Sequence, residues 1–205
     1  MSAVLKPMSL ADFLAWEERQ DTKHEFDGFG PVAMVGVTRA HSRIQKNILF
    51  ALEGRLRGKT CEPHGGDLKI EVAGRIRYPD AFVVCTPGAP TDKIVTDPVV
   101  IFEILSDSST RRDRVDKNEE YRLTPSVQRY VMLEQDTQAA TVFAREGERW
   151  VGTLHKGGGA VLPMPELGIE VPLAEFYEGL SLGADERSAG TPLNEAPAAR
   201  TEEGS

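Results

Sequence analysis

The chain has 205 residues and a formal net charge of −8, with 40% hydrophobic and 27% charged residues. This length supports one hydrophobic core of ordinary size and is hardly enough for two domains. No window approaches the roughly 18 apolar residues of a membrane span, and the first ten residues contain no secretory hydrophobic region, so we expect a cytoplasmic protein with no membrane association. The net acidity argues against a protein that coats nucleic acid through a uniformly basic surface.

Residues 1–180 are expected to form a single domain. Residues 181–205 are rich in small, acidic, proline and glycine residues without apolar periodicity, which predicts a disordered tail. The two cysteines, Cys61 and Cys85, show no CxxC or Cys/His spacing. This isolation favours reduced thiols in or near the core over a disulfide or a metal site.

The predicted elements begin with an amphipathic helix over residues 9–20, followed by two short strands around a glycine-rich turn at 24–36. Apolar residues at spacing four predict a helix over 40–57 that packs on a sheet. The pattern then becomes that of strands rich in Val, Ile, Phe and Tyr, at residues 67–72, 75–84, 98–105, 127–135, 139–146 and 149–155.

A helix predicted at 110–123 lies between strands 98–105 and 127–135, and a short helix is expected at 172–179. A strand, a crossover helix and a second strand form a βαβ unit, whose two strands are parallel. Strand 98–105 is apolar on both faces, so it belongs in the middle of the sheet. The predicted fold class is therefore α/β (α+β), a mixed central β-sheet flanked by helices, with β-hairpins in the C-terminal part.

Glu103 is the one charged residue among the apolar residues 99–104. A buried carboxylate costs several kcal/mol unless its charge is compensated. One interpretation is an ion pair with a lysine or arginine inside the core. The following helix offers a partner, because Asp113, Lys117 and Tyr121 lie at i, i+4 and i+8 on one helix face.

That face should look toward the sheet if the helix buries its few apolar residues, Val115 and Leu123, and Lys117 could then approach Glu103. A solvated charged helix with an incidental ion pair remains the alternative.

Asp80 is the second notable carboxylate, because it is the only charge in the apolar run that ends at Cys85 and it follows Pro79, which marks an edge or a bend. An Asp before a strand is often only a turn residue. Together with Glu103 and an inward Lys117, however, it would suit Mg²⁺ or Mn²⁺, hard cations that take oxygen ligands and retain several waters. The lysine could then orient water for attack on a phosphodiester.

These residues resemble the PD-(D/E)XK nuclease superfamily, with "YPDAFVV" as the PD element and "IFEIL" as the acidic strand, although Leu105 stands where the usual E-x-K lysine is expected. Within it, the chain is similar to the Uma-two family of small bacterial proteins, labelled as restriction endonucleases. The motif E-[IVL]-L-S followed by D-x-x-x-K-x-x-x-Y matches residues 103–106 and 113–121, and the resemblance extends from about residue 9 to residue 178. Tyr130-Val131 departs from an aromatic pair that is common in the family.

The resemblance implies a restriction-endonuclease-like core in which Asp80 and Glu103 are metal ligands for Mg²⁺ or Mn²⁺ and Lys117 is the water-orienting or charge-stabilising residue. Glu25, in the opening motif with Asp27-Gly28, and His41, at the start of the long helix, are weaker candidates for completing the site. Supporting roles fall to two residues of the lysine's own helix face, Asp113 and Tyr121.

The leading hypothesis is a metal-dependent endonuclease that hydrolyses DNA phosphodiester bonds, and a homodimer is an open expectation because paired sites cut both strands. Basic residues that could contact phosphates are Arg39, Arg43, Lys46, Arg75, Arg77, Arg111 and Arg112, although solvated surface charge explains each of them as well. The alternative is a catalytically inactive module that binds nucleic acid or protein on a nuclease-like fold. Hydrolysis of another phosphoester also stays open, because fold does not fix substrate.

Overall fold

The structure is a computed structural model that describes residues 7–106 and 111–182, and only the backbone of residues 111–114. From residue 183 onward, the predicted tail lies outside the described residues. None of the described helices is long and apolar enough to cross a membrane.

A six-stranded sheet forms the centre of the fold, in the order β11-β10-β9-β8-β6-β3. Strands β8 and β9 are parallel and sit in the interior of the sheet, and the other neighbours are antiparallel. Both the parallel βαβ pair and the central place of the strand that carries Glu103 are therefore confirmed. The strands are β3 (Glu62–Gly65), β6 (Ala81–Val84), β8 (Pro98–Ile104), β9 (Arg129–Leu133), β10 (Ala139–Glu146) and β11 (Arg149–Lys156).

A second sheet has the order β2-β1-β5-β4-β7, and a separate hairpin, β12–β13, follows in the C-terminal part. The predicted strand at 75–84 is in fact two strands, because the chain leaves the second sheet after Arg77 and enters the central sheet at Ala81. Pro79 therefore marks a bend between two sheets. The remaining strands are β1 (His24–Phe26), β2 (Pro31–Ala33), β4 (Lys69–Val72), β5 (Arg75–Arg77), β7 (Ile94–Val95), β12 (Val161–Met164) and β13 (Ile169–Pro172).

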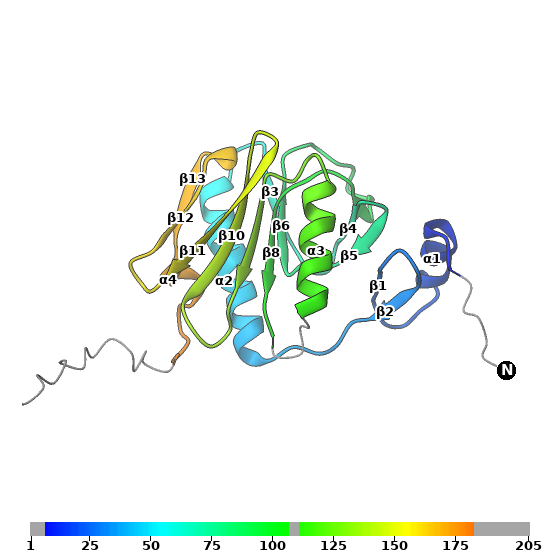
Figure 1. The fold of residues 1–205 in the computed structure, drawn as a ribbon, viewed down its shortest axis with the longest axis horizontal. Helices are drawn as coiled ribbons and strands as arrows, with labels where there is room; N and C mark the ends of the chain where they lie inside the picture. The colour runs from blue at the N-terminus through cyan, green and yellow to red at the C-terminus, as the bar shows by residue number, and fades with distance from the viewer. Residues whose placement is uncertain (1–6, 107–110, 183–205) are drawn as a thin grey trace, which may run out of the picture.

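The two long helices cover opposite faces of the central sheet (Figure 1). Helix α2 buries the apolar residues that the spacing of four predicted, including Ile44, Ile48 and Leu52, against Val100 and Phe102. On the other face, Tyr121 of α3 packs with Ile101 of β8. The predicted class, a mixed sheet flanked by helices, is confirmed. The helices are α1 (Leu10–Glu17), α2 (Arg39–Leu56), α3 (Arg111–Leu123) and α4 (Leu173–Phe176), with a 3₁₀ turn at Pro165–Leu167.

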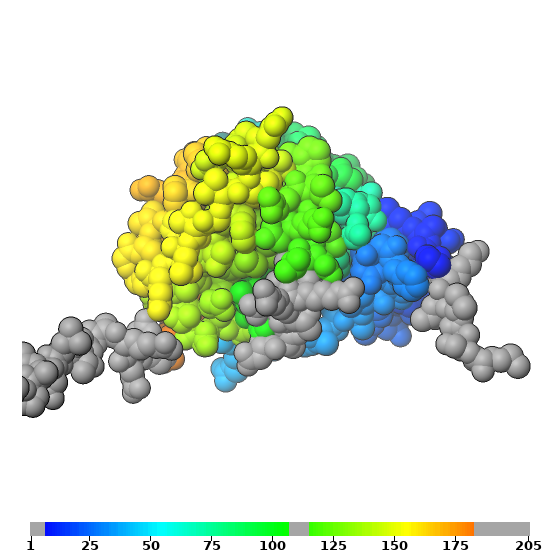
Figure 2. Space-filling model, in the orientation of Figure 1, coloured from blue at the N-terminus to red at the C-terminus, as the bar shows by residue number. Residues whose placement is uncertain are grey.

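Helix α3 is exposed on the face of the molecule that Figure 2 shows. On the face shown in Figure 2, its green surface lies between the yellow surface of the β10–β11 hairpin and the blue surface of the N-terminal segment. Tyr121 of α3 joins one apolar cluster with residues of both sheets, among them Ile70 of β4 and Ile101 of β8.

Cys61 and Cys85 form a disulfide, so the expectation of two reduced thiols is wrong. Cys61 precedes β3 and Cys85 follows β6, and these strands pair antiparallel from Glu62 opposite Val84 onward. The pairing brings together two cysteines that lie 24 residues apart, a contact that sequence spacing alone does not reveal.

Replacing both cysteines with serine is expected to lower the free energy of unfolding by about 3 kcal/mol, because the disulfide restricts the unfolded chain over this loop. Denaturant unfolding of the oxidised protein and of the double variant measures the difference. Two reactive thiols in denatured protein that has not been reduced would contradict the disulfide.

Candidate active site

A groove of about 1000 Å³ lies beside α3 and the start of α2. One wall is apolar and consists of residues 32–37, which are the end of β2 and the segment that leads toward α2. The other side carries most of the side chains that the sequence singled out, which come from β1, α2, the β5–β6 bend, β8 and α3: Glu25, His41, Asp80, Glu103 and Lys117.

Asp80 is held firmly at the bend between the two sheets. Its Oδ1 lies 2.7 Å from His41 Nε2, and its Oδ2 accepts a hydrogen bond of 2.6 Å from the backbone N–H of Ile104. One turn along α2 from His41, the Gln45 side chain donates to the backbone carbonyl of Asp80 at 2.9 Å. Gly66 keeps this approach open, because a Cβ there would lie 3.2 Å from the Pro79 carbonyl.

Glu103 lies near the end of β8 with its side chain 13% exposed. Its Oε1 accepts a hydrogen bond of 2.8 Å from the Tyr121 hydroxyl and lies 3.3 Å from Lys117 Nζ. Burial raises the pKa of Glu103 to about 7, and the carboxylates of Asp80 and Glu25 add to this effect, while Lys117 and Tyr121 oppose it. Lys117 and Tyr121 therefore compensate the negative charge of Glu103 only in part.

Lys117 faces the sheets, which is one of the two orientations that the helix pattern left open, and its side chain is 13% exposed. Burial of Val115 and Leu123, the expected cause of that orientation, does not occur, because these side chains are 57% and 65% exposed. The inward face of α3 is instead formed by Lys117, Glu120 and Tyr121, and the last two are buried. The side chain of Asp113 lies outside the described residues.

Glu25 on β1 is a further carboxylate of the groove. Its Oε1 lies 3.4 Å from Lys117 Nζ and accepts a hydrogen bond of 3.2 Å from the backbone N–H of Tyr78. Lys117 thus bridges Glu25 of the second sheet and Glu103 of the central sheet. Asp27, in the same opening motif, instead shapes a turn, because its Oδ1 accepts hydrogen bonds from the backbone N–H groups of Phe29 and Gly30.

Arg77 is buried next to Glu25, a position that the sequence did not indicate. It is 4% exposed, so the expectation that it contacts phosphates is wrong. Its guanidinium makes two contacts of 2.7 Å with Glu120 and lies 3.1 Å from Glu25 Oε2. Although burial disfavours the charged form, Glu120 and Glu25 raise the pKa of Arg77. Arg75 is also engaged, with Nε 3.0 Å from Glu120, which argues against a phosphate contact there.

The other basic candidates divide into two groups. Arg39, Arg43 and Lys46 are exposed on the first turns of α2. The side chains of Arg111 and Arg112 lie outside the described residues.

The donor set suits a hard divalent cation in its chemistry, because five carboxylates border one groove and the charge on Glu103 is only partly compensated. Its arrangement is less complete. Both oxygens of Asp80 and Oε1 of Glu103 have protein partners. Among residues 7–106 and 111–182, no three His, Cys, Asp or Glu side chains are arranged to hold a metal ion.

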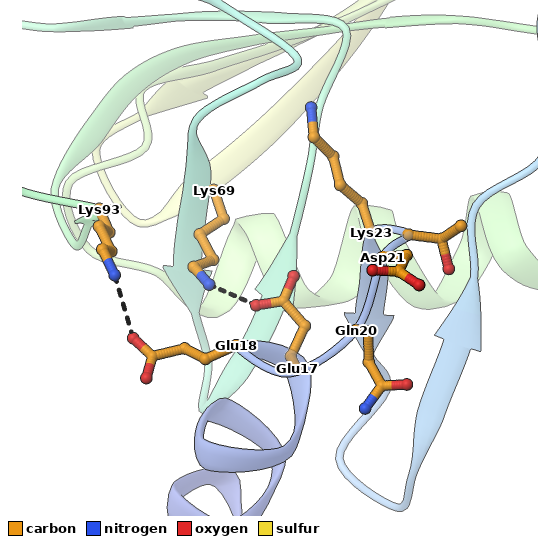
Figure 3. Close-up of a pocket in the computed structure, with 8 residues that line it drawn as sticks. Glu17, Glu18, Gln20, Asp21, Lys23, Lys69 and Lys93 are labelled. Carbon is orange, nitrogen blue, oxygen red and sulfur yellow. Dashed lines mark hydrogen bonds and ion pairs between the residues drawn. The ribbon is translucent and has the colours of Figure 1, made fainter.

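A smaller pocket of about 370 Å³ lies at the end of α1 (Figure 3). Its charged groups neutralise one another, since Lys69 donates to Glu17 at 2.5 Å and Lys93 to Glu18 at 3.2 Å. The Tyr78 hydroxyl donates to the second oxygen of Glu17, and burial together with this carboxylate raises the pKa of Tyr78. We therefore interpret this pocket as the attachment of α1 to the second sheet.

The model of the Uma2 family, described as "Putative restriction endonuclease", matches residues 10–174. The chain belongs to this family. The resemblance noted in the sequence to the Uma-two proteins is thereby confirmed.

Two relatives come from Synechocystis sp. (strain ATCC 27184 / PCC 6803 / Kazusa). The chain is 28% identical to the uncharacterized protein slr1290 over 183 residues, which are 88% of this chain and 96% of the relative. It is 27% identical to the uncharacterized protein sll1609 over 157 residues, 74% of this chain and 89% of the relative.

The fold also matches a crystal structure described as a "putative nuclease" from Anabaena variabilis ATCC 29413, with a TM-score of 0.70 and 17% sequence identity. The match covers 83% of this chain and 98% of that chain. At this identity the comparison shows a shared fold.

Proposed function

We propose that the protein is a metal-dependent endonuclease that hydrolyses DNA phosphodiester bonds. The observation that carries the proposal is the place of Lys117, whose ammonium lies between Glu25 and Glu103 in the groove that Asp80 also borders. Membership of a family described as restriction endonucleases supports it.

Asp80 and Glu103 are the residues that would hold Mg²⁺ or Mn²⁺. When bound, the ion would supply Lewis-acid stabilisation of the charge that develops on the phosphate. Lys117 would orient the attacking water or stabilise the same charge, because an ammonium in a partly buried groove acts more strongly than one in bulk water. His41 and Tyr121 would hold the carboxylates of Asp80 and Glu103 in place.

The substrate strand would reach the groove past the first turns of α2, where Arg39, Arg43 and Lys46 are exposed and could contact phosphates. These contacts would carry no sequence information and would weaken as salt concentration rises.

A second candidate function is a module that binds nucleic acid or protein without cleaving it. The specific observation in its favour is that Asp80 and Glu103 already have protein partners, and that the described residues form no ready three-ligand metal site. A binding module and a nuclease differ in one measurable respect, which is turnover.

Incubation of supercoiled plasmid with purified protein tests the proposal. We expect nicking in Mg²⁺ or Mn²⁺, none in EDTA, and at least about a hundredfold slower nicking by Asp80→Asn. Linear product formed in a single encounter would indicate two paired sites, as a homodimer provides. Binding of DNA without metal-dependent nicking would favour the module, and nicking that is unchanged in Asp80→Asn would overturn the site assignment.

A further inference from the structure

Helix α3 is attached to the rest of the molecule mainly through polar contacts. Of its described side chains, Glu120 and Tyr121 are buried, whereas its apolar residues Val115 and Leu123 face solvent. The place of Lys117 on this helix therefore depends on what holds Glu120 and Tyr121. Tyr121 connects α3 to the central sheet through Glu103 and packs with Ile70 and Val72 of β4, while Glu120 ties the helix to β5 of the second sheet.

That attachment converges on Arg77 of β5. Its Nε and Nη2 each lie 2.7 Å from one oxygen of Glu120, the paired geometry in which a guanidinium fixes a carboxylate most strictly. Its Nη1 lies 3.1 Å from Glu25 Oε2. Arg77 therefore holds both neighbours that define one side of the lysine: the helix that carries Lys117, and Glu25, the carboxylate opposite its ammonium.

We propose that Arg77 is a positioning residue, which places Lys117 Nζ between Glu25 and Glu103 by tying Glu25 and α3 to the same guanidinium. The proposal rests on the proposed function where its consequence is measured as cleavage. Without Arg77, Glu25 loses the partner of Oε2 and can rotate away from Lys117. Glu120 loses its paired contacts and keeps only the single contact of 3.0 Å with the more exposed Arg75, which fixes the helix less strictly. A displacement of about 1 Å at a catalytic group is enough to cost about a hundredfold in rate.

A purely structural ion pair is the competing interpretation, and the molecule contains a matched control for it. Arg129 of β9 is 8% exposed and contacts Glu166 through two nitrogens at 2.6 and 3.0 Å. Neither Arg129 nor Glu166 lines the groove. Arg129→Met therefore removes an arginine–carboxylate pair of similar burial and geometry that has no contact with the site.

The experiment compares Arg77→Met, Arg77→Lys and Arg129→Met in two measurements. The first is the steady-state kinetics of DNA cleavage, and the second is the rate at which acetic anhydride labels Lys117, read by mass spectrometry. We expect Arg77→Met to lower kcat about 10- to 100-fold with KM within about twofold, and to speed Lys117 labelling several-fold relative to Lys93. Arg77→Lys keeps the charge but not the paired contact, so it should restore part of both values. Arg129→Met should lower the unfolding midpoint and leave kcat and labelling within about twofold.

Equal kcat and equal Lys117 labelling in wild type and in folded Arg77→Met would overturn the proposal. If Arg77→Met does not fold, Arg77→Lys decides, because unchanged kcat and labelling in that variant would overturn it equally. If wild type shows no cleavage at all, the proposed function fails, yet the labelling rates still test the position of Lys117 on their own.

Discussion

Lys117→Met is expected to slow plasmid cleavage by at least about a hundredfold while leaving the fold intact. Methionine retains the apolar stem of the lysine, so packing against the sheets changes little. The ammonium is lost, however, and with it the positive charge between Glu25 and Glu103. The measurement is the single-turnover nicking rate in saturating Mg²⁺, with circular dichroism as the check on folding.

Lys93→Met is a control for this substitution. Lys93 is also ion-paired with a glutamate, Glu18, but it lies in the smaller pocket at α1 rather than in the groove (Figure 3). Its replacement should leave the nicking rate within about twofold of wild type. A Lys117→Met protein that cleaves within about threefold of wild type would rule out a catalytic role for the ammonium.

Glu103→Gln is expected to abolish cleavage and at the same time to stabilise the protein above neutral pH. The pKa of Glu103 is raised from 4.5 to about 7, mainly by burial, so the folded state binds this proton more tightly than the unfolded chain does. The contribution of Glu103 to stability is therefore fully present below pH 4.5 and is lost as the pH rises through 7. At pH 8.5 the ionised group costs the folded protein on the order of 3 kcal/mol, part of which the neutral amide recovers.

Thermal unfolding in EDTA at pH 5 and pH 8.5 measures this effect. Glu103→Gln should unfold several degrees above wild type at pH 8.5, with most of the difference gone at pH 5. Glu166→Gln is the control, because it weakens the buried pair with Arg129 and should unfold below wild type at both pH values. Added Mn²⁺ should stabilise wild type and not Glu103→Gln, since a ligand stabilises the state that binds it. If Glu103→Gln unfolded below wild type at pH 8.5, the raised pKa of Glu103 would be contradicted.

Local periodicity predicted the elements around the site well. The apolar run of β8 and the pattern of α3 determine the strand–helix–strand unit, and both are properties of contiguous residues. The inward direction of Lys117 was one of two alternatives in the sequence, and the reason given for it was wrong, since ion pairs rather than Val115 and Leu123 orient the helix.

What the sequence did not reveal depends on contacts between distant segments. Arg75-Ile76-Arg77 alternates like a strand with one solvated face, and only the division into two sheets shows that Arg77 points into the protein. Glu120, three residues after Lys117, was the available signal, because this spacing places it close to the same helix face. The disulfide was missed for the same kind of reason, since it depends on the pairing of β3 with β6.

The polar underside of α3 also determines how the site can come apart. Apart from Tyr121, the described part of α3 buries little apolar surface. Release of the helix from the sheets therefore breaks ionic contacts and exposes little apolar surface to water. Such an opening separates Arg77 from Glu120 and exposes both charges to water and salt. The population of the open form should therefore grow with ionic strength, whereas the α2 side, held by Ile44 and Ile48, stays closed. The groove can thus lose its lysine without global unfolding.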